Sequence, residues 1–208
     1  LEDIKQDIGE YAFQSEYMNE PIDDKTAIFK RHWLKKWEVL PPKEQMDIYA
    51  YIDPAISQKE TADYTAIVVI GVDKKSGQIY VLDYIRDHLT LKEQIESSFN
   101  LYLIHKFEVL GVEEVGYQQA LKQEIDRVSA ERRFYLPTRA IHQDKDKVRR
   151  AIAISVFFEK GWILLKDLND NLYNELVTFP MGIHDDIVDA LMGAIELTRG
   201  SGFSFATI

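Results

Sequence analysis

Residues 48–53 read Ile48-Tyr49-Ala50-Tyr51-Ile52-Asp53, an apolar run that ends in a carboxylate. Its β-branched and aromatic content predicts a buried strand over Asp47–Asp53. A second run of the same kind, Val109-Leu110-Gly111-Val112-Glu113, predicts another short strand that also ends in an acid. If the two strands are adjacent and parallel, both carboxylates leave the same rim of the sheet. The two runs therefore predict a pair of acids at one sheet edge.

A third acidic site lies far along the chain, in His184-Asp185-Asp186-Ile187-Val188-Asp189-Ala190-Leu191. This block opens a predicted helix, and either Asp186 or Asp185 shares a helix face with Asp189 at a spacing of three or four residues. Carboxylate oxygens are hard ligands that suit Mg²⁺ or Mn²⁺. Two such ions about 3.5–4 Å apart can activate water and stabilise a leaving oxygen. Three acidic sites from distant segments thus indicate a divalent-metal nuclease.

Each acid also has a structural interpretation without a metal. Asp53 can start a turn, and Glu113 with Glu114 can form a solvated strand exit. Asp185 and Asp186 favour a helix N-terminus through capping and the helix dipole. In an alternating strand the neighbour of Glu113 faces the other way, so we prefer Glu113 to Glu114 as the ligand.

The order of predicted elements indicates an α/β protein with a mixed β-sheet flanked by helices, an antiparallel meander followed by parallel strands. The predicted strands are Asp47–Asp53, Tyr64–Asp73, Gln78–Ile85, Val109–Glu113, Tyr135–Ile141 and Trp162–Leu165. The predicted helices are Thr90–Phe107, Gln118–Arg132, Lys145–Glu159, Asn169–Val177 and His184–Thr198. Asp73–Gly77 reads as a hairpin turn, and Pro137 pushes its strand toward an edge.

Three segments divide the chain. Residues 1–45 read as a polar and aromatic arm, with helical stretches around Glu2–Tyr17 and Lys30–Trp37 and a break at Pro41-Pro42. Residues 46–200 form the predicted catalytic domain, and 201–208 a C-terminal tail. Because the chain begins at Leu1, we expect it to be a piece of a longer protein.

Composition limits the chemistry. The chain has no cysteine, so disulfides and thiolate metal sites are excluded. No apolar run approaches the roughly 18 residues of a membrane span. The net charge of −10 argues against a protein that coats nucleic acid. The stretch Lys122–Arg150 nevertheless holds nine basic and five acidic residues, a local balance of +4. It can contact phosphates or simply solvate helix faces.

Five segments together resemble the C-terminal nuclease domain of the phage terminase large subunit. They are Tyr51-Ile52-Asp53-Pro54-Ala55, Ala62-Asp63-Tyr64-Thr65-Ala66-Ile67, Gly111-Val112-Glu113-Glu114-Val115-Gly116-Tyr117-Gln118, Asp146-Lys147-Val148-Arg149-Arg150-Ala151, and Phe179-Pro180-Met181-Gly182-Ile183 running into the His184–Leu191 block. The arm segment Phe13–Pro21 is similar to the family's connection between ATPase and nuclease domains. The ordered set covers nearly the whole chain.

The resemblance implies a ribonuclease H-like fold with two Mg²⁺ or Mn²⁺ ions per site. Asp53 would bridge the ions, Glu113 would be the ligand from the second strand, and Asp186 or Asp185, supported by Asp189, the ligand from the helix. The side chains that support these ligands would be Asp63, His184 and Glu114. The candidates for phosphate contact are Lys145, Lys147, Arg149, Arg150 and Arg139.

The same resemblance implies an endonuclease that cuts concatemeric double-stranded DNA in the host cytoplasm, at the procapsid. Its partners would be an ATPase domain, the portal and the small terminase subunit. No phosphate-binding Gly-x-x-x-x-Gly-Lys-Ser/Thr motif occurs, so this segment itself is expected to have no ATPase activity. It also lacks a Gly-x-Ser-x-Gly motif or a cysteine nucleophile.

Two other functions stay open at this point. A junction resolvase or transposase-like nuclease would share the carboxylates but would not explain the arm or Phe179-Pro180. A docking module without catalysis would bind metal structurally, or bind the portal or motor through its acidic cluster.

Overall fold

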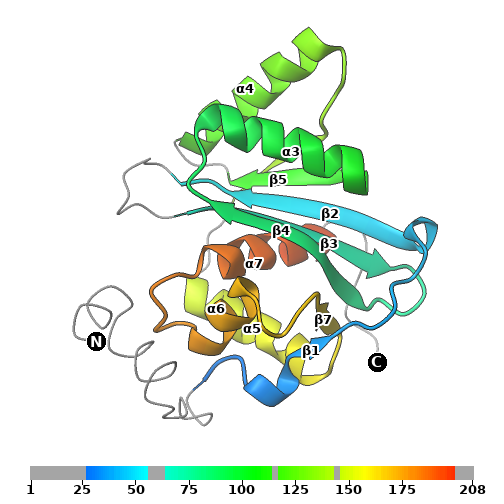
Figure 1. Cartoon of the computed structure of the whole chain (residues 1–208), viewed down its shortest axis with the longest axis vertical. Helices are drawn as coiled ribbons and strands as arrows, with labels where there is room; N and C mark the ends of the chain where they lie inside the picture. Colours follow the sequence, from blue (N-terminus) through cyan, green and yellow to red (C-terminus); the bar gives the residue numbers. More distant parts are fainter. Residues whose placement is uncertain (1–26, 56–63, 114–116, 143–145, 200–208) are drawn as a thin grey trace.

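One mixed β-sheet organises the computed structural model, which describes residues 27–55, 64–113, 117–142 and 146–199 (Figure 1). Within these ranges seven strands pair in the order β1-β7-β4-β3-β2-β5-β6. The strands are β1 Lys35–Lys36, β2 Met46–Asp53, β3 Thr65–Asp73, β4 Ile79–Asp87, β5 Val109–Glu113, β6 Thr138–Ile141 and β7 Ile163–Leu165. The helices are α3 Leu91–His105, α4 Tyr117–Arg132, α5 Lys147–Glu159, α6 Asn171–Thr178 and α7 Asp186–Arg199, with 3₁₀ turns at Arg31–Trp33 and Lys43–Gln45.

The predicted α/β architecture is confirmed. Strands β2, β3 and β4 form the antiparallel meander, and β5 and β6 continue the sheet in parallel from β2. The β3–β4 connection is the predicted turn, in which the Ser76 hydroxyl donates to Asp73 at 2.6 Å and Gly77 has a φ of +72°. Strand β6 follows Pro137 and lies at a sheet edge, as expected from the missing amide hydrogen of proline.

One predicted helix is wrong. Around Lys30–Trp37 only Arg31–Trp33 is helical, as a 3₁₀ turn, and Lys35–Lys36 pairs with β7 as strand β1. Pairing with the sheet edge overrode the local helical pattern here. The helix predicted around Glu2–Tyr17 and the arm segment Phe13–Pro21 lie outside the described residues.

Helices cover both faces of the sheet (Figure 1). Side chains alternate along β2, so Tyr49 and Tyr51 join the core under α5, α6 and α7, while Ile48 and Ile52 join the core under α3 and α4. The central strands β2 and β3 are therefore apolar on both faces, which explains their near-continuous hydrophobic runs. Within the described ranges, none of the helices combines the length and apolar character needed to cross a bilayer.

Helix α7 packs against β2 and β3, and two glycines, one on α7 and one on β5, lie against one aromatic ring of β2. A Cβ at Gly193 of α7 would lie 2.6 Å from carbon atoms of the Tyr51 ring. A Cβ at Gly111 of β5 would lie 2.6 Å from the same ring, on Cδ2. The Tyr51 ring therefore occupies space that side chains at these positions would fill. This contact fixes α7 over the pair of strands that end in acids.

Residues 27–45 add to the same core. Phe29 is 1% exposed and makes edge-to-face contacts with Phe158 at 5.4 Å and with Phe179 at 5.9 Å between ring centroids. Leu34 is also buried, just before β1. The division of the chain at residues 45/46 and 200/201 stays a prediction.

Replacing Gly193 with alanine is expected to destabilise the domain by about 1–3 kcal/mol, since the new methyl group overlaps the Tyr51 ring. Glycine-to-alanine changes inside helices usually stabilise by up to about 1 kcal/mol. A loss of unfolding free energy in this variant would therefore identify the overlap with the Tyr51 ring as its cause. Urea unfolding measures the difference. The double variant Gly193→Ala/Tyr51→Leu should recover part of the loss. A stabilised Gly193→Ala variant would contradict the close-packing argument.

Candidate active site

The acids of β2 and β5 lie at one rim of the sheet. These strands pair in parallel, with Ile52 opposite Val112, so Asp53 and Glu113 are the next residues on both strands. Side chains alternate along a strand, so Asp53 lies on the same face of the sheet as Tyr51, and Glu113 on the same face as Gly111. Tyr51 and Gly111 both face α7. The parallel pairing expected from the two apolar runs is confirmed, and it directs both carboxylates toward the helix.

Helix α7 begins at the same rim. The Asp185 carbonyl accepts the first helical hydrogen bond, from the Asp189 amide at 2.9 Å. The Glu175 carboxylate, from α6, accepts hydrogen bonds from the Ile187 and Val188 amides at 2.8 and 3.1 Å. A carboxylate on these free N–H groups is stabilised by the positive end of the helix dipole. Glu175 thereby anchors the helix start that carries Asp186 and Asp189.

The electrostatics show that these acids share one site. Burial and, in decreasing order, the negative charges of Asp189, Asp186 and Glu113 together raise the pKa of Asp53 to about 8. Burial likewise raises the pKa of Asp189 to about 6, against a lowering by Lys147. The Asp53 carboxylate thus lies within the electrostatic reach of one acid of β5 and two of α7.

Two cationic side chains of the protein contact this acidic group. Lys147, from the first turn of α5, binds Asp185 at 2.6 Å and also binds Asp189. Arg86, near the end of β4, lies 3.5 Å from Glu175 and 3.9 Å from Asp186. The helix acids are therefore divided between two partners, Lys147 on one side and Arg86 on the other.

The residues present fit hard divalent cations by their chemistry. The donors are carboxylate oxygens, and their mutual repulsion at Asp53 calls for positive charge. In the described part of the chain, no three acidic or histidine side chains converge closely enough to bind a metal ion as they stand. Instead, Lys147 contacts Asp185 and Asp189, and Arg86 and His184 lie beside Asp186.

Sequence reasoning missed Arg86 and Glu175. Both are charged residues at core-facing positions: Arg86 pairs across from Ala66 on the α7 side of the sheet, and Glu175 lies beside Leu172 and Leu176 on the buried face of α6. A charge on an apolar face was the signal that could have found them. Their partners could not be named, since the ion pair joins β4 to α6 across the fold.

An aromatic group supports Arg86 and His184 at the rim. The Arg86 guanidinium lies 4.1 Å from the Tyr64 ring centroid, a cation–π contact. Tyr64 stacks on His88 at 4.0 Å and meets the edge of His184 at 5.1 Å. His184 Nδ1 is 4.0 Å from Asp186, so this predicted supporting residue does reach the acidic group.

The predicted phosphate contacts divide into exposed and buried residues. Arg149 and Arg139 are exposed, on α5 and on edge strand β6. Arg150 is 6% exposed and its Nε donates to Glu196 at 3.0 Å, an arrangement that does not favour the predicted phosphate contact. Lys147 contacts Asp185 and Asp189 while its side chain stays 36% exposed. Three further candidates, Asp63, Glu114 and Lys145, lie outside the described residues.

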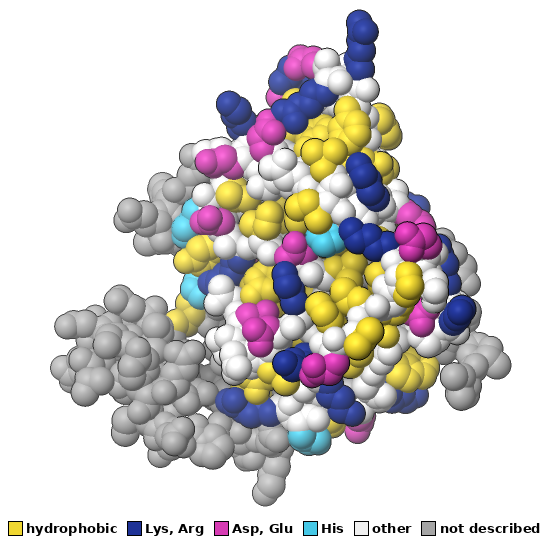
Figure 2. All heavy atoms as spheres, turned by 45° about the vertical axis from the view of Figure 1, so that its right-hand side comes forward, with side chains coloured by type: hydrophobic (Ala, Val, Ile, Leu, Met, Phe, Trp, Pro, Cys, Tyr) yellow, Lys and Arg dark blue, Asp and Glu magenta, His cyan; other side chains and the backbone are white. Residues whose placement is uncertain are grey.

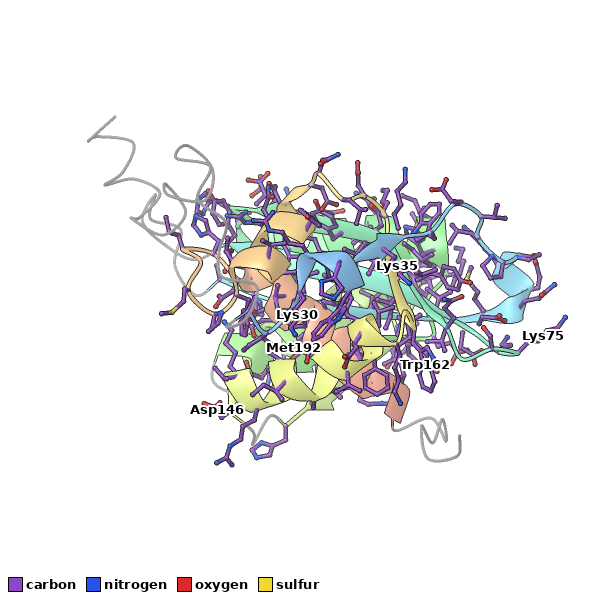
Figure 3. The ribbon with its side chains drawn as sticks, turned by 90° about the horizontal axis from the view of Figure 1, so that it is seen from below. Lys30, Lys35, Lys75, Asp146, Trp162 and Met192 are labelled. Carbon is purple, nitrogen blue, oxygen red and sulfur yellow. The ribbon has the colours of Figure 1, made fainter. Side chains whose placement is uncertain are left out.

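The first turn of α5 belongs to the acidic rim. Asp146 caps α5, its side chain accepting from the Arg149 amide at 3.2 Å. Figure 3 shows Asp146 at the opposite end of the molecule from Lys75, which lies in the β3–β4 turn. The β3–β4 turn is remote from Asp53, because β2 and β3 are antiparallel and pair Asp53 with Ala66 at the other end.

A mixed sheet of this order, with acids at the ends of two adjacent parallel strands and on the helix packed over them, defines a ribonuclease H-like domain. The chain belongs to the terminase RNaseH-like domain family, whose model matches residues 50–197. The resemblance drawn from the sequence motifs is therefore confirmed.

Solved structures give the same fold. The nuclease domain of the phage P22 large terminase has 12% sequence identity and a TM-score of 0.63, over 83% of this chain and 92% of that one. The large terminase nuclease of thermophilic phage G20c with bound cobalt has 16% identity and a TM-score of 0.59, over 82% and 96%. The human cytomegalovirus terminase nuclease domain, soaked with Mn and with an inhibitor bound, has 17% identity and a TM-score of 0.56, over 78% and 89%. The sequence has no significant match among curated proteins.

The thermal stability of the metal-free domain is expected to fall as pH rises between about 5 and 8. The pKa of Asp53 and of Glu175 is raised to about 8, mainly by burial, from ordinary values of 3.8 and 4.5. The folded state therefore binds these protons more tightly than the unfolded state, and the stabilisation disappears as pH passes the folded pKa. Melting temperatures in EDTA measure this slope.

The variants Asp53→Asn and Glu175→Gln should each flatten the slope, because neither amide titrates. An unchanged slope in both variants would contradict the raised pKa values. Glu159→Gln, at the exposed C-terminal end of α5, serves as the control and should keep the slope of the unmodified protein.

Proposed function

We propose that this domain is the metal-dependent DNA endonuclease of a viral packaging terminase, cutting concatemeric double-stranded DNA with two divalent ions, Mg²⁺ or Mn²⁺. The observation that carries the proposal is the meeting of Asp53 and Glu113, from parallel strands, with Asp186 and Asp189 of α7. The family membership and the similar solved structures, one with bound cobalt and one soaked with Mn, support the same function.

The four carboxylates would hold the ions. Asp53 is central because the negative charges of the other three acids all raise its pKa, and Asp189 raises it more than Asp186 does. Asp186 and Asp189 are three residues apart and share a helix face, and the charges of both raise the pKa of Asp53. This favours Asp186 with Asp189 as the helix ligands. When bound, the ions would supply water activation and stabilisation of the leaving oxygen.

The surrounding residues would orient this acidic group. Glu175 holds the start of α7 through two amides, and Arg86 joins Glu175 to Asp186. Tyr64 packs against both Arg86 and His184. These contacts would keep the helix carboxylates aimed at the strand ends, which matters because small displacements of ligands reduce catalysis strongly.

DNA would approach the acidic rim and its exposed cations. Arg149 lies in the first turn of α5, next to the residue that binds the acids, and Arg139 lies on edge strand β6. On the face shown in Figure 2, acidic and basic side chains are interspersed, which does not suit a phosphate backbone. The ATPase domain, the portal, the small subunit and a place in the host cytoplasm remain proposals drawn from the family.

Replacing the central acids is expected to abolish cleavage. Asp53→Asn and Glu113→Gln should each reduce plasmid cleavage in Mn²⁺ or Mg²⁺ by at least about 10²-fold, since each removes a charged ligand while keeping the side-chain shape. Gel analysis of supercoiled plasmid, with EDTA as the metal-free arm, measures the rate. Glu108→Gln removes a carboxylate from the other end of β5 and should cleave normally.

Full activity in Asp53→Asn would refute the site, and no cleavage by the unmodified domain in any metal would favour a docking module. Preferential cutting of four-way junctions over linear DNA would instead favour a resolvase.

The Arg149→Ala variant is expected to weaken DNA binding without changing sequence preference. Losing one phosphate contact should lower the slope of log affinity against log salt by about 1. Fluorescence anisotropy with a linear duplex in EDTA measures both quantities. Lys160→Ala, at the opposite end of the same helix, is the matched control and should bind like the unmodified domain. If Arg149→Ala and Lys160→Ala show the same dependence of DNA affinity on salt, the start of α5 is not part of the DNA-binding surface.

A further inference from the structure

We propose that Lys147 is an internal cation of the carboxylate cluster, which holds Asp185 and Asp189 together in the metal-free domain and competes with a divalent ion for Asp189. The inference rests on the proposed function, because it assumes that Asp189 is a metal ligand. It assigns Lys147 a positioning role in metal binding, in place of the phosphate contact expected from the sequence.

The contacts of Lys147 carry the argument. Its ammonium group binds Asp185 at 2.6 Å and Asp189 as well, so one positive charge bridges two acids that are one helical turn apart. The ammonium also lies 5.9 Å from the Phe179 ring centroid. The side chain is 36% exposed, and the Asp189 side chain 21% exposed. Lys147 is therefore held between α5 and the start of α7 and is partly shielded from water.

The position of Lys147 in α5 needs such an explanation. A cation in the first turn of a helix is disfavoured, because the N-terminus carries the positive end of the dipole. Lys147 is the first residue of α5, directly after the cap Asp146. The two acids at the start of α7 offset this penalty. Burial would lower the pKa of Lys147, yet Asp185 and Asp189 outweigh it and raise that pKa, so the side chain stays charged.

Lys147 also acts on the centre of the site. Among the carboxylates around Asp53, Asp189 has the greatest effect on its pKa, and Lys147 is the cation that opposes it. The ammonium thus neutralises in part the same repulsion that a divalent ion would neutralise. Since an Asp189 oxygen bound to Lys147 must be released before it can bind an ion in the same way, the two cations compete. Tethering to α5 keeps the ammonium close even after displacement.

Neutralising Lys147 is therefore expected to tighten metal binding. Isothermal titration of Mn²⁺ into Lys147→Met should give a Kd about tenfold or more below that of the unmodified domain. The melting temperature in EDTA should fall, because Asp185 and Asp189 lose their partner, and saturating Mn²⁺ should remove the difference. Lys147→Arg keeps the charge and should retain the original Kd within about twofold.

Two further variants keep the test decisive. Arg149→Met removes a positive charge two residues away that does not bind the acids, and it should leave the Mn²⁺ Kd within about twofold. Lys147→Gln can still donate a hydrogen bond to the acids, so it tests the same effect if Lys147→Met folds poorly. Circular dichroism checks the fold of each variant.

The failures of the two proposals are distinguishable. Unchanged or weaker Mn²⁺ binding in a folded Lys147→Met or Lys147→Gln domain would overturn the competition. An equal gain in Arg149→Met would also overturn it, in favour of a general charge effect. If the unmodified domain and Asp53→Asn both bind no Mn²⁺, the metal site itself is refuted.

Discussion

The site depends on the contact between Tyr51 and two glycines, because this contact brings α7 down onto β2 and β5. Gly193 and Gly111 leave space for the ring, and any side chain at either position would meet it at 2.6 Å. The helix consequently starts beside the strand ends, where Asp53 and Glu113 leave the sheet. Carboxylates on two adjacent strands and a second pair on one helix can only cooperate if backbone packing sets their separation. Interiors packed to crystal-like density transmit such constraints directly.

Charge balance is the second constraint, and it works against the first. Close packing gathers Asp53, Glu113, Asp186 and Asp189, whose repulsion raises the pKa of Asp53. The chain offsets this repulsion with Lys147 on one side and with Arg86 on the other. These two cations hold the acidic side chains in place and keep their carboxylate groups apart from one another. On our proposal, the same residues preserve the site and limit its affinity for a metal, which links stability to function within one cluster.

Much of the site could be predicted from the sequence, because its main acids stand at recognisable places. Apolar runs that end in Asp53 and Glu113 predict strand ends, and alternation predicts which neighbour faces the helix. Family motifs placed the fold correctly, and the terminase RNaseH-like model covers residues 50–197. The sequence was insufficient where long-range contacts decide. Arg150 is buried because α5 packs against α7, whose Glu196 accepts its hydrogen bond. Lys35–Lys36 forms a strand because it can pair with the edge of β7.

The sequence by itself determined the α/β class, the acidic strand ends and the helix that opens with Asp185 and Asp186, since periodicity and local chemistry specify these over a few residues. Only the tertiary structure decided that Glu175 anchors α7, that Arg86 reaches Asp186, and that Lys147 binds Asp185 and Asp189. Each of these contacts joins segments far apart in the chain. Their partners follow from the packing of whole helices on the sheet, and no local pattern encodes which charges that packing will bring together.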